Sequence, residues 1–441
     1  MMLTAIHAEA IYYPVTYKGS FESSDAVLNR IWETGAYTAH LSMQDGIWDA
    51  PKRDRGRWAG DLDVEGKTIL TAFGDTWLLE DTLDRLAAAT SDGSFVNGIP
   101  GYSAQWIAGL ATLYLHSGDR ELLAKQQDHL RHILATMDEA VEPNGRLKHT
   151  TRGWGFVDWA PGLYGSGPDV EMGTALEFAR AYKMAGEMLK DLGDSGAATK
   201  YASQAAKMVS AAAEVGYGST VQVNSMAVLT APDAASAQAI AAKALAEIRQ
   251  ETPNDPRISP YFNAYLLDAL ARAGREKQAQ DWMRAYWGGM LAEGATSFWE
   301  SYDLRWPKTN FHLSLEADGT SGYFVSLAHG WSSGPTAWLA EQVLGVEPTS
   351  PGYTTVAIHP RLSGLDWAKG TVPTPHGTIA VSMSRKELQI TLPLDVKTAT
   401  VTLTEPGVGM GMGQVLLNGK AVPPGNPLSL TAPGTYTIRW Q

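Results

Sequence analysis

The run Ala235-Ser236-Ala237-Gln238-Ala239-Ile240-Ala241-Ala242-Lys243-Ala244-Leu245-Ala246-Glu247-Ile248 consists of good helix formers and contains no glycine or proline. Leu266 to Ala273 has the same character. Outward from these two runs, helical segments alternate with loops rich in Gly, Pro and Trp as far as about residue 345. The first predicted helix is capped by Ser23-Ser24-Asp25 and continues to about Leu41. The other predicted helices lie near 61–73, 76–90, 103–117, 120–140, 171–191, 195–215, 221–230, 234–249, 262–274, 276–292 and 333–344.

About a dozen helices joined alternately by short and long loops favour a toroid of helical hairpins, the (α/α)6 barrel. We predict this mainly α domain over residues 21–346. An extended solenoid of helical repeats is the competing architecture, but the sequence shows no self-similarity at a fixed period. In a barrel, the inner helix ends and the long loops form one deep pocket.

The pattern of apolar and polar residues changes after residue 346. Five segments alternate apolar and polar residues with a period of two, and Asn418-Gly419 and Glu387 mark expected turns. We predict an antiparallel β-sandwich over residues 347–441, with strands at 354–358, 377–383, 388–392, 398–403 and 434–440. Residues 1–20 are predicted as an N-terminal strand segment, with the strand at Ile11 to Tyr17.

The composition restricts the class of protein. The 441 residues carry a formal net charge of -12 and no basic run, which argues against nucleic acid or an anionic membrane as a partner. There is no cysteine, no apolar run long enough to span a membrane and no visible signal peptide. A cytoplasmic protein is therefore the default expectation, and a periplasmic or secreted one if a signal segment has been removed. The ten histidines show no clustered spacing, so no metal site is expected.

The segment from Trp48 to Asp63 combines four aspartates, four basic residues and two tryptophans with Pro51, Gly56 and Gly60. Carboxylates and arginines hydrogen-bond hydroxyl groups, and tryptophan faces cover the C–H faces of a sugar ring. This combination predicts a pocket for a neutral, hydroxylated ligand. A surface loop with several ion pairs is the alternative.

Three further stretches place acidic or polar residues beside aromatic ones at expected helix ends. They contain Asp158-Trp159, Trp299-Glu300 and the run from Ser326 through His329 to Trp331. Glycoside hydrolysis needs one protonated carboxyl group to protonate the leaving oxygen and one ionised carboxylate to activate water or attack the sugar. A barrel could bring the first loop and Glu300 together for this purpose.

The sequence resembles the α-L-rhamnosidases of glycoside hydrolase family 78. The resemblance rests on Asp49 to Asp61, which is similar to the family's loop D-C-P-Q-R-x-E-R-x-x-W-x-G-D, and on the three stretches above. The tracts Pro351 to Pro360 and Trp367 to Gly377 look like the family's C-terminal β domain. The likeness extends in order over about residues 20–385.

The resemblance implies an (α/α)6 barrel that hydrolyses terminal α-L-rhamnosides with inversion and without a cofactor. Asp54 falls at the position of the family's general acid, and Glu300 matches the general base that activates water. The other residues that it implies for substrate binding are Asp49, Arg53, Trp58, Asp61, Trp106, Asp158, Trp159, Trp299 and His329.

The chain also departs from the family pattern. The acid position holds Asp instead of Glu, the loop before it is one residue shorter, and the family's N-terminal β-sandwich domains are missing apart from the tract before residue 20. Structural alternatives remain at this stage: Asp54 in an ion pair with Arg53 or Arg57, Glu300 in a salt bridge at a helix end, and Asp61 as a helix cap. Alternative functions are a glycosidase for another sugar and a carbohydrate-binding protein without activity. The oligomeric state stays open.

Overall fold

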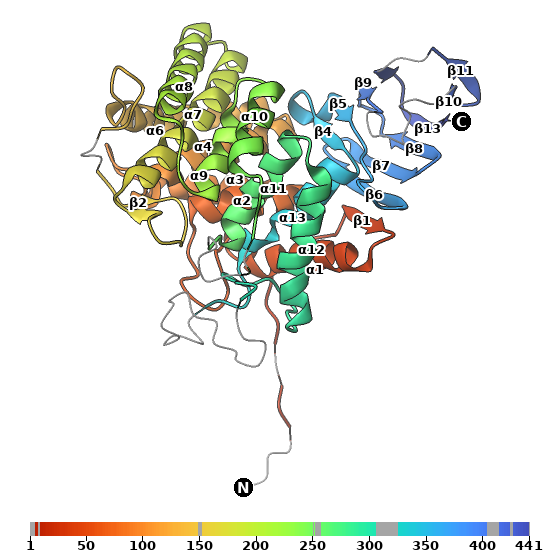
Figure 1. Cartoon of the computed structure of the whole chain (residues 1–441), viewed down its shortest axis with the longest axis horizontal. Helices are drawn as coiled ribbons and strands as arrows, with labels where there is room; N and C mark the ends of the chain where they lie inside the picture. The colour runs from red at the N-terminus through yellow and green to blue at the C-terminus, as the bar shows by residue number, and fades with distance from the viewer. Residues whose placement is uncertain are drawn as a thin grey trace.

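The chain folds into a helical part and a β part, which lie side by side in the computed structural model (Figure 1). The structure describes residues 5–7, 9–148, 152–249, 251, 257–305, 325–403, 414–423 and 427–440. Its α-helices are α1 (Ala26–Ser42), α2 (Ala59–Ala72), α3 (Trp77–Ala88), α4 (Pro100–Ser117), α5 (Arg120–Lys125), α6 (Gln127–Glu139), α7 (Pro168–Asp191), α8 (Ser195–Val215), α9 (Val221–Thr230), α10 (Ala234–Ala244), α11 (Pro260–Arg272), α12 (Glu276–Ala292) and α13 (Gly334–Trp338).

Six helices form a closed inner ring. In the order α2, α4, α7, α9, α11, α13, each helix packs against the next, and α13 packs against α2. Almost every residue of α2 and α4 is buried, whereas α10 buries only Ala237 and Ala241, as expected for an outer helix with one face on the core. The ring confirms the (α/α)6 barrel, because a solenoid would leave its first and last helices apart.

The predicted helices agree closely with the observed ones, with three main differences. The segment predicted as one helix over 333–344 consists of α13 followed by a π-helix at Leu339–Val343, and a 3-10 turn at Gly330–Ser333 precedes it. The segment 120–140 is divided at Gln126 into α5 and α6. The helix predicted to about residue 249 ends at Ala244, because Leu245 leaves the helical conformation with φ −120° and ψ 25°. The predicted cap of α1 is confirmed, since the Asp25 side chain accepts hydrogen bonds from the backbone N–H groups of Val27 and Leu28.

The β part is built from two sheets. A seven-stranded sheet has the order β1-β6-β7-β8-β13-β10-β11, and a four-stranded sheet has the order β12-β9-β5-β4. Asn418 and Gly419 both have positive φ and turn the chain between β10 and β11, as predicted. The strands are β1 (Ser20–Ser23), β4 (Val346–Pro348), β5 (Thr355–Ile358), β6 (Trp367–Thr374), β7 (Gly377–Ser384), β8 (Glu387–Leu392), β9 (Thr398–Val401), β10 (Val415–Leu417), β11 (Lys420–Val422), β12 (Leu428–Leu430) and β13 (Gly434–Trp440).

Three details of the β part correct the prediction. The sheets are not wholly antiparallel, because β5 and β9 pair in parallel. Glu387 opens β8 and pairs with Arg439 instead of lying in a turn. The expected strand at Ile11 to Tyr17 is absent. Tyr13 in this segment instead donates its backbone N–H to Met43 O and stacks on Trp77, because the tyrosines find aromatic partners on the helices.

The N-terminal strand lies further along the chain, at β1, and it belongs to the C-terminal sheet. Ser20 pairs with Thr371 and Ser23 with Ala368 on β6. The barrel is thus flanked in sequence by strands that share one sheet.

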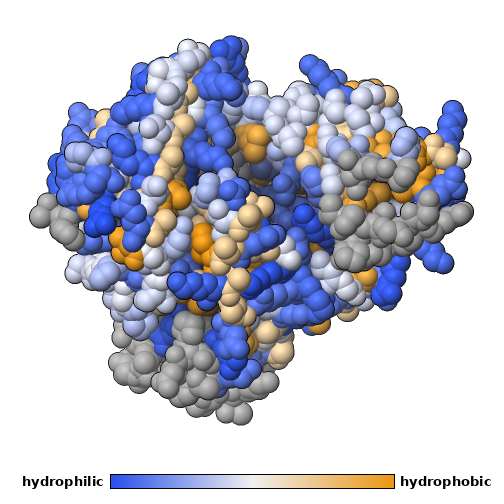
Figure 2. Space-filling view, turned by 45° about the horizontal axis from the view of Figure 1, so that its top comes forward, coloured by the Kyte–Doolittle hydropathy of each residue, from blue (hydrophilic) through white to orange (hydrophobic). Residues whose placement is uncertain are grey.

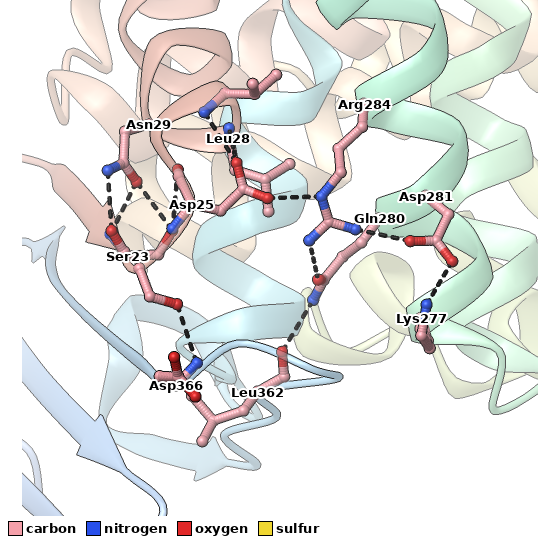
Figure 3. A network of polar contacts seen from close by, with 12 residues as sticks. Ser23, Asp25, Leu28, Asn29, Lys277, Gln280, Asp281, Arg284, Leu362 and Asp366 are labelled. Atoms are coloured by element: carbon pink, nitrogen blue, oxygen red, sulfur yellow. Dashed lines mark hydrogen bonds and ion pairs between the residues drawn. The ribbon is translucent and has the colours of Figure 1, made fainter.

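A polar network joins the two parts of the molecule (Figure 3). Arg284 on α12 donates from Nε to the Asp25 carboxylate at 2.6 Å and from Nη2 to Gln280 Oε1 at 3.3 Å. Gln280 in turn donates to Leu362 O, in the segment that leads to β6. The same network contains Ser23, Asn29, Asp281, Lys277 and Asp366. The cap of α1, the helix α12 and the β part are therefore held by one set of hydrogen bonds.

A cavity of about 660 Å³ lies at one end of the inner ring, where the helices face β4 and the residues after β5. Figure 2 shows a mainly hydrophilic hollow between the helical and β parts. Several of its charged groups are paired: Lys67 Nζ lies 2.6 Å from Glu341 and 3.5 Å from Asp268, and Arg180 lies 2.6 Å from Asp63. None of the helices in the described ranges is both long and apolar enough to cross a bilayer.

Candidate active site

The loops that carry the predicted site residues all connect an outer helix to the next inner one. These loops lie between α1 and α2, between α6 and α7, and between α12 and α13. Consecutive helices of the barrel run in opposite directions, so such loops gather at the end of the ring where the inner helices begin. The predicted site residues in these loops therefore lie at this end, opposite the cavity beside β4.

Hydrogen bonds fix the first and the last of these loops to one another and join two parts of the last loop. Gly330 N donates to Asp49 O at 2.8 Å, and Lys52 Nζ donates to Val325 O at 3.0 Å. His329 N donates to Phe298 O at 3.0 Å. Segments that are hundreds of residues apart in the sequence thus form one surface around the barrel axis.

Glu300 is buried and held at both carboxylate oxygens. Its Oε2 accepts from Ser326 N at 2.9 Å, and its Oε1 accepts from Arg53 Nη2. Trp331 Nε1 donates to the Glu300 carbonyl at 3.0 Å. This arrangement fixes the orientation of an acceptor-only carboxylate, which is what a base requires.

Asp54 lies at the tip of the first loop, and its side chain is 46% exposed. Its Oδ2 lies 3.6 Å from Arg53 Nη1, so one guanidinium contacts both Asp54 and Glu300. Asp54 and Arg55 both adopt left-handed backbone conformations, with φ of 59° and 54°. Such conformations cost energy for residues with side chains and are concentrated at functional sites.

Asp49, Asp61 and His329 form a buried group beside this pair. His329 Nε2 lies 2.9 Å from Asp61 Oδ1, and Gly56 N donates to Asp49 Oδ1 at 2.9 Å. Burial and the charge of Asp61 raise the pKa of Asp49 to about 7. Burial also raises the pKa of Asp61. Burial lowers the pKa of His329, but the hydrogen bond to Asp61 and the Asp61 charge outweigh it and raise the pKa overall.

Asp61 lies in the first turn of α2, as expected for an acidic residue at a helix N-terminus. It is not the cap residue, because Trp58 occupies that position. The side chain of Asp61 instead faces His329. The alternative prediction of a capping role is therefore wrong.

The remaining predicted residues lie around this centre or outside it. Trp58, half-buried, meets Tyr102 edge to face at 6.2 Å, and Trp299, buried, meets Tyr302 at 5.8 Å. Trp106 has no exposed surface, and its Nε1 donates to Leu83 O at 2.8 Å. The structure therefore places Trp106 in the core between α3 and α4 and not on a wall that a sugar could contact.

Asp158 and Trp159 belong to the loop between α6 and α7. Asp158 is buried, accepting from Gln222 Nε2 at 2.7 Å, Ser259 N at 3.2 Å and Trp159 N at 2.8 Å. Its hydrogen bonds thus fix the loop to α9 and to the start of α11. Trp159 is half-buried within a group of aromatic rings.

The sequence prediction missed Glu65. This residue is fully buried on α2, one turn after Asp61, and neither carboxylate oxygen has a hydrogen-bond partner among the residues that the structure describes. Burial, with the charges of Asp61 and Asp49, raises the pKa of Glu65 well above its usual value. The i, i+4 spacing from Asp61 was the available signal, because it puts both carboxyl groups on one face of the helix.

Comparisons with known proteins support a single family. The model of the bacterial α-L-rhamnosidase six-hairpin glycosidase domain matches residues 16–343, and the model of the bacterial α-L-rhamnosidase C-terminal domain matches residues 345–414. A curated α-L-rhamnosidase from Streptomyces avermitilis is 25% identical over 409 residues, which cover 87% of this chain and 38% of that protein.

Solved structures show the same fold. A family 78 rhamnosidase from Bacillus sp. GL1 aligns with a TM-score of 0.75 and 26% identity over 90% of this chain and 44% of that one. The Streptomyces avermitilis α-L-rhamnosidase complexed with L-rhamnose aligns with a TM-score of 0.76 and 20% identity over 96% of this chain and 42% of that one. The chain therefore spans less than half the length of these relatives.

Proposed function

Because this chain belongs to the bacterial α-L-rhamnosidase family, we propose that it hydrolyses terminal α-L-rhamnosides as an inverting exo-glycosidase. The observation that carries the proposal is the arrangement of Asp54 and Glu300 on opposite nitrogens of the Arg53 guanidinium. A cation that contacts each carboxyl group with a different terminal nitrogen keeps the two groups apart, and an inverting mechanism requires two carboxyl groups that are far enough apart to admit a water molecule beside the sugar.

In this mechanism the exposed Asp54 protonates the glycosidic oxygen as the bond to the leaving group breaks. The buried Glu300 takes a proton from the water that attacks the anomeric carbon from the opposite face. Asp49, Asp61 and His329 bind the hydroxyl groups of the sugar, and Trp58 and Trp159 contact its C–H faces. The family also supports L-rhamnose as the sugar, since a relative of the same fold has been solved in complex with it.

The test is hydrolysis of p-nitrophenyl α-L-rhamnoside, followed by proton NMR from the first minutes. We expect release of p-nitrophenol, with β-L-rhamnose as the first anomer before mutarotation. Initial α-L-rhamnose would contradict inversion. Turnover of another p-nitrophenyl glycoside alone would assign the barrel to a different sugar, and binding of L-rhamnose without turnover would indicate a carbohydrate-binding protein.

A further inference from the structure

A group of aromatic rings lies in and around the hairpin of β2 (Gly155–Phe156) and β3 (Tyr164–Gly165), at the edge of the helical part (Figure 1). The ring centroids of Trp154 and Phe156 are 5.3 Å apart, those of Phe156 and Trp159 5.0 Å, and those of Trp159 and Tyr164 5.6 Å. These four rings are in contact over the whole hairpin. They form a continuous apolar surface, which we call the hairpin platform.

Two rings of the platform are exposed, and hydrogen bonds hold the hairpin and its loop against the barrel. Trp154 is 42% exposed and Tyr164 45% exposed, whereas Phe156 is buried. Phe156 pairs with Tyr164 across the hairpin, and Trp154 N donates to Gly98 O at 2.9 Å. The hydrogen bonds that Asp158 accepts from Gln222 and Ser259 fix the loop to α9 and to the start of α11. The exposed rings are thus ordered before any ligand binds, which lowers the entropic cost of binding.

The platform is continuous with the candidate active site. Phe156 meets Tyr102 edge to face at 5.9 Å, and Tyr102 meets Trp58 at 6.2 Å. Trp58 lies between Asp54 and Asp61 in the sequence and directly precedes α2. Ring contacts through the buried Phe156 and Tyr102 therefore join the loop that carries the acid to the exposed rings of the hairpin.

We propose that Trp154 and Tyr164 form a binding site for the leaving group of the substrate and that this leaving group is a planar aromatic aglycone. The inference rests on the proposed function, because only a glycosidase has a leaving group to bind. Flat rings stack on exposed indole and phenol faces. A second sugar would also need hydrogen-bond partners for its hydroxyl groups. The carboxylate of the hairpin, that of Asp158, is already occupied by protein donors.

The first experiment compares two substrates with different leaving groups. Trp154→Ala and Tyr164→Ala should each raise KM for 4-methylumbelliferyl α-L-rhamnoside about three- to tenfold, with kcat changed less than about twofold. Neither substitution should alter KM for an α-L-rhamnosyl-(1→4)-glucose disaccharide. Trp154→Phe keeps a ring and should restore most of the affinity. Trp77→Ala is the matched control, because Trp77 is also an exposed tryptophan (61%) but lies on the outer helix α3.

Equal changes for both substrates, or no change for either, would overturn the proposal. Weaker binding of the disaccharide alone would assign the platform to a sugar and would overturn the aromatic assignment.

Binding of free 4-methylumbelliferone, measured by isothermal titration calorimetry, tests the platform without turnover. We expect binding to the native chain that Trp154→Ala weakens and Trp77→Ala does not. If the chain hydrolyses no rhamnoside but this binding pattern holds, the proposed function fails and the platform remains an aromatic-binding site. If rhamnosides are hydrolysed but the pattern is absent, the platform fails alone.

Discussion

Arg53 donates a hydrogen bond to Glu300 across 247 positions of sequence and contacts Asp54 with its other terminal nitrogen. The two proposed catalytic carboxylates thus contact one cation, which belongs to the loop after α1 and reaches Glu300 in the loop after α12. Arg53 thereby fixes the relative position of two groups that no local sequence pattern could place together.

Glu300→Gln should reduce kcat by about 10²- to 10⁴-fold, because an amide cannot accept the proton of the attacking water. The amide keeps the size of the side chain, and its single oxygen can accept the hydrogen bond of either Arg53 or Ser326 but not of both in their present positions, so the shape of the pocket is kept. Binding of L-rhamnose, followed by calorimetry, should therefore persist. A variant that turns over p-nitrophenyl α-L-rhamnoside at the native rate would remove Glu300 as the base.

Asp54→Asn should have an effect that depends on the leaving group. We expect a large loss of kcat/KM, about 10²- to 10⁴-fold, for a rhamnosyl disaccharide, whose alkoxide leaving group needs protonation. The loss should be clearly smaller for p-nitrophenyl α-L-rhamnoside, since p-nitrophenolate leaves without full protonation. Asp45→Asn is the control, because Asp45 is an exposed carboxylate that pairs with Arg57 beside the same loop. Equal losses on both substrates would speak against Asp54 as the acid.

Asp49 should make the stability of the protein depend on pH. Its pKa of about 7 in the folded state lies above the usual value of 3.8, so the folded protein binds a proton that the unfolded chain releases. The contribution of Asp49 to stability is therefore complete below about pH 4 and is lost as the pH rises to about 7. Each unit of raised pKa corresponds to about 1.4 kcal/mol.

Asp49→Asn removes this titration, so the free energy of unfolding should fall less between pH 4 and pH 7 than in the native protein. Urea unfolding at several pH values measures the difference. The control is Asp81→Asn, which removes an aspartate on the outer helix α3 that pairs with the exposed Arg85. Parallel pH profiles for the native protein and the Asp49 variant would contradict the prediction.

Gly330→Ala should destabilise the protein by about 1–3 kcal/mol, because a Cβ atom there would overlap the Glu65 carboxyl group. If this overlap is the cause, Glu65→Ala and Gly330→Ala together should destabilise less than the sum of the two single changes. Gly109→Ala is a suitable control, since its Cβ would meet Leu83 at an ordinary 3.5 Å. Additive effects in thermal unfolding would show that Glu65 and Gly330 do not share this space.

The barrel could be predicted from the sequence because the positions of helices depend largely on local residues. Capping by Asp25 and the alanine-rich run around Ala237 and Ala241 identify helices without knowledge of their neighbours. The motif loops likewise predicted Asp49, Asp61 and His329, which the fold brings together.

The errors arose where tertiary contacts decide the outcome. Ile11 to Tyr17 has the residues of a strand, but its tyrosines pack on helices instead of joining a sheet. Trp106 was placed by its distance along the chain, and sequence distance does not reveal on which side of α4 an indole lies. Glu65 was missed because a carboxyl group in a helix is usually solvated, and only the closed ring buries it.

The pairing of β1 with β6 has a consequence for biosynthesis. Ser20 leaves the ribosome long before Thr371, its partner, has been translated. Until then the growing chain carries an edge strand without its neighbour, and the helical ring closes with its first strand still unpaired. Completion of that sheet is therefore a late, long-range event, because the strand that precedes the barrel waits for a partner that is translated after the whole barrel.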